Sequence, residues 1–182
     1  MIKQKYHIIS DFNIEPFQRI VNAKKSFFNI NKFNFSNIFE QLDFKKKSSN
    51  ILVWANAENI FKTVNDFLKN HDVSFKKLDN EISNFSQLLI NINKNNNKII
   101  LNSFCFVDEF PFSNNLLYKS KYSKSYIFNY INNKLSEEFT NYDNIVFLDF
   151  NDILKKFNGE VYNYQFYLGT KSTYTIEFYN YY

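Results

Sequence analysis

The run Ile51-Leu52-Val53-Trp54 sets the architecture expected of this chain. Its apolar residues are uninterrupted, as they are in strands that a parallel sheet buries on both faces. Further short apolar runs lie at residues 6–9 before it, and at residues 99–104 and 145–148 after it. We therefore predict that all four runs are strands of one mostly parallel sheet.

The segments between these runs carry apolar residues at helical spacing, as at Ile60, Val64 and Phe67. Helices are predicted over residues 14–21, 36–42, 56–68, 78–92, 122–139 and 153–157. Residues 26–35 are either another strand or a long connection, and the aromatic tail from Tyr162 is ambiguous. Strands that alternate with helices predict a three-layer α/β/α domain with a doubly wound sheet.

Length and composition fit a single domain over residues 1–182. A chain of 182 residues matches the size of one core, and its 23 Phe and 13 Tyr supply large buried side chains. No window approaches the roughly 18 apolar residues of a membrane-spanning helix. The first residues enter a strand instead of a signal peptide's apolar core, so we expect a cytoplasmic protein.

Charge, cysteine and histidine content limit the possible functions. The net charge of +4 is mild, and Lys45-Lys46-Lys47 is the one three-residue basic run, which makes nucleic-acid binding unlikely. Cys105 is the single cysteine and lies in an apolar run, so we predict a packing residue. His7 and His71 are far apart and no Cys/His cluster has ligand spacing, so no metal site is predicted.

Glycine is scarce, with two residues in the whole chain. Two glycines cannot supply the glycine-rich loops that cradle nucleotide phosphates, so no cofactor is expected in this chain. Turns that need a positive φ are expected to use Asn and Asp, which tolerate that conformation best after glycine.

Polar residues follow each predicted strand at the end where doubly wound sheets bind ligands. They are Ser10, Asn56, Ser103 and Asp149. In such sheets the ligand lies at the carboxyl ends of the strands, where the strand order reverses. The same residues are also common helix caps, and that simpler role stays open.

Three sequence blocks in order resemble a known family. They are Ile8-Ile9-Ser10-Asp11-Phe12-Asn13-Ile14-Glu15-Pro16-Phe17, then Val53-Trp54-Ala55-Asn56, then Tyr164-Gln165-Phe166-Tyr167-Leu168-Gly169-Thr170-Lys171. Together they resemble the N-terminal module of FkbH-like proteins, which join an SGNH-hydrolase-like domain to a haloacid-dehalogenase-like (HAD) domain. The resemblance implies a flavodoxin- or SGNH-like sheet, and a HAD domain or acyl-carrier protein as partner. It also implies that the chain is the N-terminal part of a longer protein.

The catalytic residues of that resemblance do not line up. Ser10-Asp11-Phe12 stands where SGNH enzymes carry Gly-Asp-Ser, and no Asp-x-x-His follows near the C-terminus. The HAD motif D-x-D-x-T is absent as well, so phosphoryl chemistry is not expected in this chain. The catalytic residues are therefore unknown, with Ser10 and Asp11 as candidates, and whether the chain is an enzyme stays open.

The preferred hypothesis is a catalytically degenerate SGNH-like module of polyketide or polysaccharide biosynthesis. It would bind a carrier-linked or small hydroxylated substrate in a groove lined by Ser10, Asp11, Asn13, Asn56, Ser103, Tyr167 and Lys171. One alternative is an esterase or acyltransferase with Ser10 as nucleophile, and another is a non-catalytic interaction domain. We expect Tyr167 or Lys171 to reach the strand ends, and Tyr179, Tyr181 and Tyr182 to be exposed.

Overall fold

The computed structural model describes residues 4–24, 28–30, 37–43, 50–70, 72–93, 98–105 and 123–182. Within them, five strands form one sheet in the order β2-β1-β3-β4-β5. The strands are β1 (Gln4–Ile9), β2 (Phe28–Ile30), β3 (Asn50–Val53), β4 (Ile99–Asn102) and β5 (Ile145–Leu148). Each neighbouring pair is parallel. This is the flavodoxin-type doubly wound order, and it confirms the predicted α/β class.

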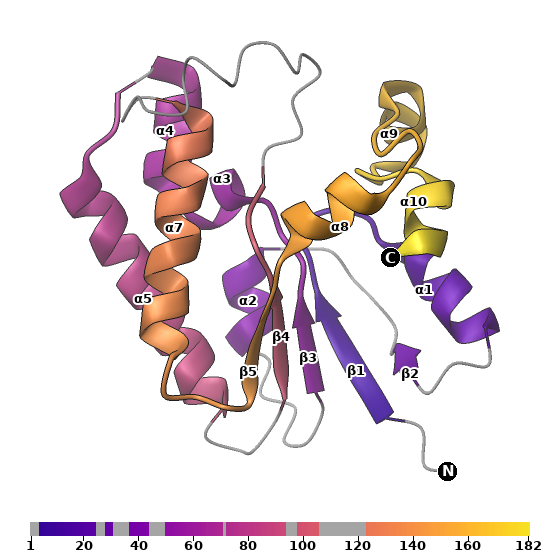
Figure 1. Cartoon of the computed structure of the whole chain (residues 1–182), viewed down its shortest axis with the longest axis horizontal. Helices are drawn as coiled ribbons and strands as arrows, with labels where there is room; N and C mark the ends of the chain where they lie inside the picture. The colour runs from indigo at the N-terminus through magenta and orange to yellow at the C-terminus, as the bar shows by residue number, and fades with distance from the viewer. Residues whose placement is uncertain are drawn as a thin grey trace.

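The helices lie on both faces of the sheet (Figure 1). They are α1 (Glu15–Ala23), α2 (Ile38–Asp43), α3 (Ala57–Ile60), α4 (Lys62–Asn70), α5 (Phe75–Asn93), α7 (Lys124–Phe139), α8 (Phe150–Lys156), α9 (Tyr164–Thr170) and α10 (Ile176–Tyr181). Helices α2, α3, α4, α5 and α7 pack on one face in a largely aliphatic core. Helices α1, α8 and α10 pack on the other, around Trp54. None of the helices in the described ranges is long and apolar enough to cross a membrane.

Several predicted boundaries were wrong, for local reasons. The helix predicted over residues 56–68 divides at Phe61, whose extended backbone separates α3 from α4. Helix α8 begins at Phe150, before the predicted residue 153, because the Asp149 side chain caps it by accepting from Asp152 N. Strand β4 ends at Asn102 instead of residue 104, since the Asn132 amide hydrogen-bonds the backbone N and O of Phe104.

The aromatic tail forms α9 and α10, and two of its tyrosines are not exposed as predicted. The Tyr179 side chain is 1% exposed, because it packs against Phe17 and Trp54. Tyr182 stacks on Trp54 and is partly buried, while Tyr181 is exposed. The predictions on Lys45-Lys46-Lys47 and His71 lie outside the described residues.

Candidate functional site at the carboxyl edge of the sheet

The strand order reverses between β1 and β3, which are hydrogen-bonded neighbours. From β1 the chain passes to α1 on the aromatic face, and from β3 to α3 on the aliphatic face. The two connecting loops therefore diverge at the carboxyl edge of the sheet. This is the place where doubly wound domains bind their ligands.

Asp11 links these two loops. Its carboxylate accepts the backbone N–H of Asn56 at 3.1 Å and 3.2 Å, one distance to each oxygen. The side-chain amide of Asn59 also donates to it. Burial raises the pKa of Asp11 above its ordinary value, while the hydrogen bonds from Asn59 and Asn56 act in the opposite direction. Two of the predicted site residues, Asp11 and Asn56, therefore meet at the point of strand reversal.

Glu58 is a residue of this edge that the sequence reasoning missed. It lies in the first turn of α3, and its pKa is raised by burial and, further, by the nearby charge of Asp11. Two carboxyl groups therefore belong to this partly buried edge of the sheet. The signal was available, since Glu58 stands two positions after Asn56 at the end of a buried strand.

Ser10 is closed off from this edge. Its side chain is fully buried, and its Oγ donates to Phe12 O at 3.2 Å and accepts from Phe12 N at 3.3 Å. The Gln41 amide holds the carbonyl oxygen of Ser10 at 2.8 Å. A serine nucleophile needs access to substrate and a base at its hydroxyl. In this conformation Ser10 instead shapes the turn that presents Asp11.

Ser103 ties the end of β4 to the start of α8. Its backbone N donates to Leu148 O at 2.8 Å, and its Oγ accepts from Phe150 N at 2.9 Å. The residue is 7% exposed. These contacts give it a structural role at the strand ends.

Asn13 contacts the C-terminal block, although the two are far apart in the sequence. Asn13 N donates to Lys171 O at 3.0 Å, and the Asn13 side chain donates to Thr170 O at 2.8 Å. Lys171 has a φ of 57°, so a lysine adopts the left-handed conformation that was expected of Asn or Asp. The Lys171 Nζ lies 5.5 Å from the centre of the Tyr167 ring. Asn13, Tyr167 and Lys171 thus form a second group of the predicted residues.

Cys105 is partly buried after the end of β4. It packs against the aromatic core, and burial, with smaller effects from the charges of Asp149 and Glu58, raises its pKa to about 12. A thiol with this pKa stays protonated at neutral pH, so it is a poor nucleophile. In the part of the chain that the structure describes, no group of three or more His, Cys, Asp or Glu is placed to hold a metal ion.

The fold and its edge define a doubly wound α/β domain of the flavodoxin type. No protein-family model matches the sequence, and no curated protein matches it. Among solved structures, it is similar to the N-terminal part of the protein BF1531 from Bacteroides fragilis, described as containing a phosphatase domain complexed with Mg. The TM-score is 0.71 at 10% identity, over 99% of this chain and 49% of the other. The likeness shows the α/β fold, and this chain spans about half the length of that neighbour.

Proposed function

We propose that this chain is a substrate-binding α/β module that works with a HAD-type phosphatase domain, in the same chain or in another. The support is twofold. Its fold is similar to the N-terminal part of a protein described as containing a phosphatase domain. Its sequence blocks resemble FkbH-like proteins, in which an SGNH-like module accompanies a HAD domain.

The Asp11 carboxylate, held at the point where the strand order reverses, is the observation that carries the proposal. Asp11 is held in place by the Asn56 backbone and the Asn59 amide, so its position is set before a ligand arrives. Glu58 supplies a second carboxyl group whose pKa is raised by burial. Carboxylates recognise hydroxyls by accepting hydrogen bonds from them. A small hydroxylated acyl unit, carried on a pantetheine arm, is the substrate class that fits both this edge and the family resemblance.

Binding is favoured over hydrolysis because the serine at the strand end is unavailable. The Ser10 Oγ is buried and engaged with both backbone groups of Phe12. We therefore expect no turnover of short-chain aryl esters, and no change in that result for Ser10→Ala.

The test is an NMR titration of the ¹⁵N-labelled chain with S-glyceroyl-pantetheine, and with pantetheine as the partner compound that lacks the hydroxylated acyl unit. We expect shifts of the Asn56 backbone and Asn59 side-chain signals with the first compound alone. Glu58→Gln should weaken binding about tenfold, the usual cost of losing a charged hydrogen bond. The matched control is Glu138→Gln on the exposed surface of α7. Equal binding of both compounds, or shifts that avoid Asn56 and Asn59, would contradict the proposed substrate class.

The partnership with a phosphatase domain has a separate test in the surrounding reading frames. A D-x-D-x-T domain in the same frame or beside it supports the proposal. A genome in which no such domain accompanies this chain contradicts it.

A further inference from the structure

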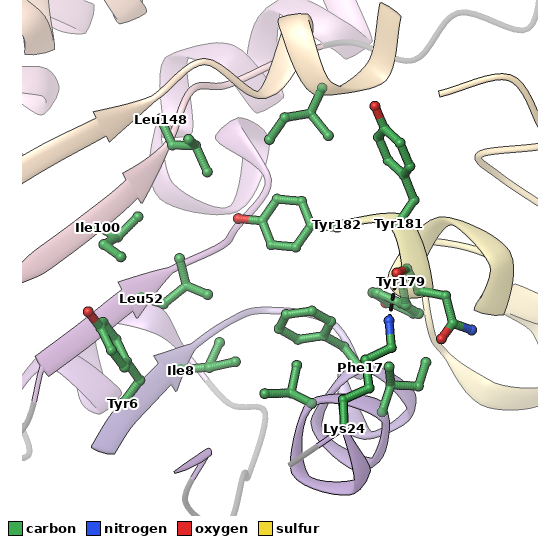
Figure 2. A pocket seen from close by; sticks show the side chains of 14 residues that line it. Tyr6, Ile8, Phe17, Lys24, Leu52, Ile100, Leu148, Tyr179, Tyr181 and Tyr182 are labelled. Atoms are coloured by element: carbon green, nitrogen blue, oxygen red, sulfur yellow. Dashed lines mark hydrogen bonds between the residues drawn. The ribbon is translucent and has the colours of Figure 1, made fainter. Parts of the chain in front are cut away.

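A second site, apart from the strand edge, lies on the aromatic face of the sheet. There a cavity of about 540 Å³ separates the sheet from α1 and the end of α10 (Figure 2). Its floor includes Ile8, Leu52 and Ile100 from three adjacent strands. The volume falls in the range of small-molecule sites, about 300–1,000 Å³.

The described residues that line the cavity are mostly apolar. Among them Lys24, which follows α1, is the one charged side chain. Its Nζ donates to Asn180 O at 2.8 Å, which holds the ammonium group between α1 and α10. Figure 2 shows Lys24 reaching across to the C-terminal helix beside the cavity. No carboxylate side chain is among these described lining residues, so their charge favours an anion.

A buried amide lies next to the floor of the cavity. Asn102 is on the same side of β4 as Ile100, because side chains two positions apart on a strand share a face. Its Oδ1 accepts from the Tyr182 hydroxyl at 2.7 Å, and Tyr182 lines the cavity. Within the described residues the Asn102 Nδ2 has no hydrogen-bond partner, and Asn102 is only 4% exposed. Buried polar atoms are rarely left unpaired, so this donor indicates a place for an acceptor from a ligand or from water.

We propose that this cavity binds an amphipathic organic anion, whose aliphatic or aromatic body lies over Leu52 and Ile100 and whose carboxylate lies at Lys24. The apolar floor excludes a strongly hydrated polyol. The single cation sets the sign and the number of charges, and it lies at the rim where a charged head can stay solvated. This proposal does not rest on the function proposed for the strand edge, since none of the edge residues lines the cavity.

The chain contains an intrinsic fluorescent reporter of ligand binding in this cavity. Trp54 is the only tryptophan, and its ring stacks on Tyr182 at a centroid distance of 4.4 Å. A ligand that contacts Tyr182 should therefore change the intrinsic fluorescence. The probes are 8-anilinonaphthalene-1-sulfonate, sodium dodecanoate below its micellar concentration, and 1-dodecanol as the uncharged counterpart.

We expect one sulfonate dye to bind per chain, dodecanoate to displace it, and Trp54 emission to change in parallel. Ile100→Phe fills the cavity floor and should weaken binding at least tenfold. Leu168→Phe, 52% exposed on α9, adds a ring outside the cavity and should leave binding unchanged. Dye binding that Ile100→Phe does not alter, or that exceeds one per chain with the native fold intact, would overturn the proposal.

A surface variant keeps the test independent of core packing. Lys24→Gln should weaken dodecanoate about three- to fivefold, the effect of one exposed charge pair, and leave dodecanol unchanged. Lys69→Gln, an exposed lysine on α4 at the opposite layer, is the matched control. Equal losses for dodecanoate and dodecanol in Lys24→Gln would show that the charge plays no part, and would contradict the anion assignment. Unchanged dye binding in Asp11 and Glu58 variants would separate this site from the strand edge.

Discussion

The two faces of the sheet are packed with different kinds of side chain. On one face, α5 and α7 bury aliphatic side chains such as Leu89, Ile131 and Leu135, which are all fully buried. On the other face, aromatic rings surround Trp54 at centroid distances of 4.4–5.8 Å. Those rings belong to Phe12, Phe17, Phe150, Tyr174, Tyr179 and Tyr182.

The two faces are also covered by helices of different length. Helices α5 and α7 have 19 and 16 residues, whereas α1, α8 and α10 have 9, 7 and 6. The short helices cover the carboxyl half of the sheet through the rings around Trp54. They leave the cavity over Leu52 and Ile100. We infer that the packing of the aromatic face depends on the single ring cluster around Trp54. The packing of the aliphatic face is spread along the long helices α5 and α7.

Trp54→Ala should have the largest effect, because it removes the ring that all the others contact. We expect a loss of about 3–5 kcal/mol in the free energy of unfolding, the usual cost of emptying a large aromatic site. The measurement is urea denaturation followed by far-ultraviolet circular dichroism. Trp54→Phe, which keeps a ring, is the control and should lose less. A loss below about 1 kcal/mol in Trp54→Ala would break the comparison.

Ile99 and Ile100 give a matched pair that tests the two faces on one strand. Ile99 is fully buried against the aliphatic core, while Ile100 faces the cavity and is partly exposed. Ile99→Ala should cost about 2–5 kcal/mol, and Ile100→Ala about 1 kcal/mol, because less packing is lost beside an existing cavity. Denaturation of both variants under one set of conditions checks the difference. Equal losses would mean that the cavity is closed in solution.

Buried hydroxyls on the two faces of the sheet give a second comparison, with smaller expected losses of stability. On the aromatic face, the hydroxyls of Ser172 and Tyr179 are hydrogen-bonded at 2.8 Å, and Ser172 is fully buried. Tyr179→Phe leaves Ser172 without this partner and should cost about 1–3 kcal/mol. Ser86→Ala on the aliphatic face should cost about 1 kcal/mol or less, since the carbonyl of Ser83 that it leaves lies within helix α5. Thermal unfolding of the two variants measures both losses of stability. A larger loss in Ser86→Ala than in Tyr179→Phe would contradict this prediction.

Glu58→Gln should give the smallest change in the free energy of unfolding, and the size of that change depends on pH. Burial and the Asp11 charge raise the pKa of Glu58 in the folded state, so the folded protein holds this proton more tightly than the unfolded chain does. Stability is therefore lost as pH rises from the unfolded pKa through the folded one. Glu58→Gln removes that loss, and its advantage over the parent chain should grow between about pH 4 and pH 7. Denaturation at both pH values measures this advantage, with Glu138→Gln on the exposed surface of α7 as the control.

Much of the fold was predictable because its strands are short, buried and continuous in hydrophobicity. Residues 51–53, 99–102 and 145–148 are strands as predicted. Strand β2 was ambiguous, since its three residues alternate with polar neighbours at the edge of the sheet. The tail was ambiguous because α9 and α10 are too short to establish a helical period. The packing of α10 involves Trp54, more than a hundred residues earlier in the chain.

The site was less predictable than the fold. Strand-end position directed attention to Asp11 and Asn56, which are hydrogen-bonded to each other. It did not anticipate the turn that closes around Ser10, and it missed Glu58 in the first turn of α3. The cavity on the aromatic face was not predicted, because α10, which forms part of its wall, belongs to the tail that the sequence left ambiguous.

The ring cluster around Trp54 also sets the order of events during synthesis. Three of the rings that cover Trp54 belong to Tyr174, Tyr179 and Tyr182. At a translation rate of about 5–20 residues per second, the roughly 130 residues from Trp54 to Tyr182 take about 6–26 seconds to emerge. During that interval the rings of Phe12 and Phe17 are already available to the indole, whereas those of Tyr174, Tyr179 and Tyr182 are not. The ring cluster of the aromatic face therefore becomes complete only after Tyr182 has been made.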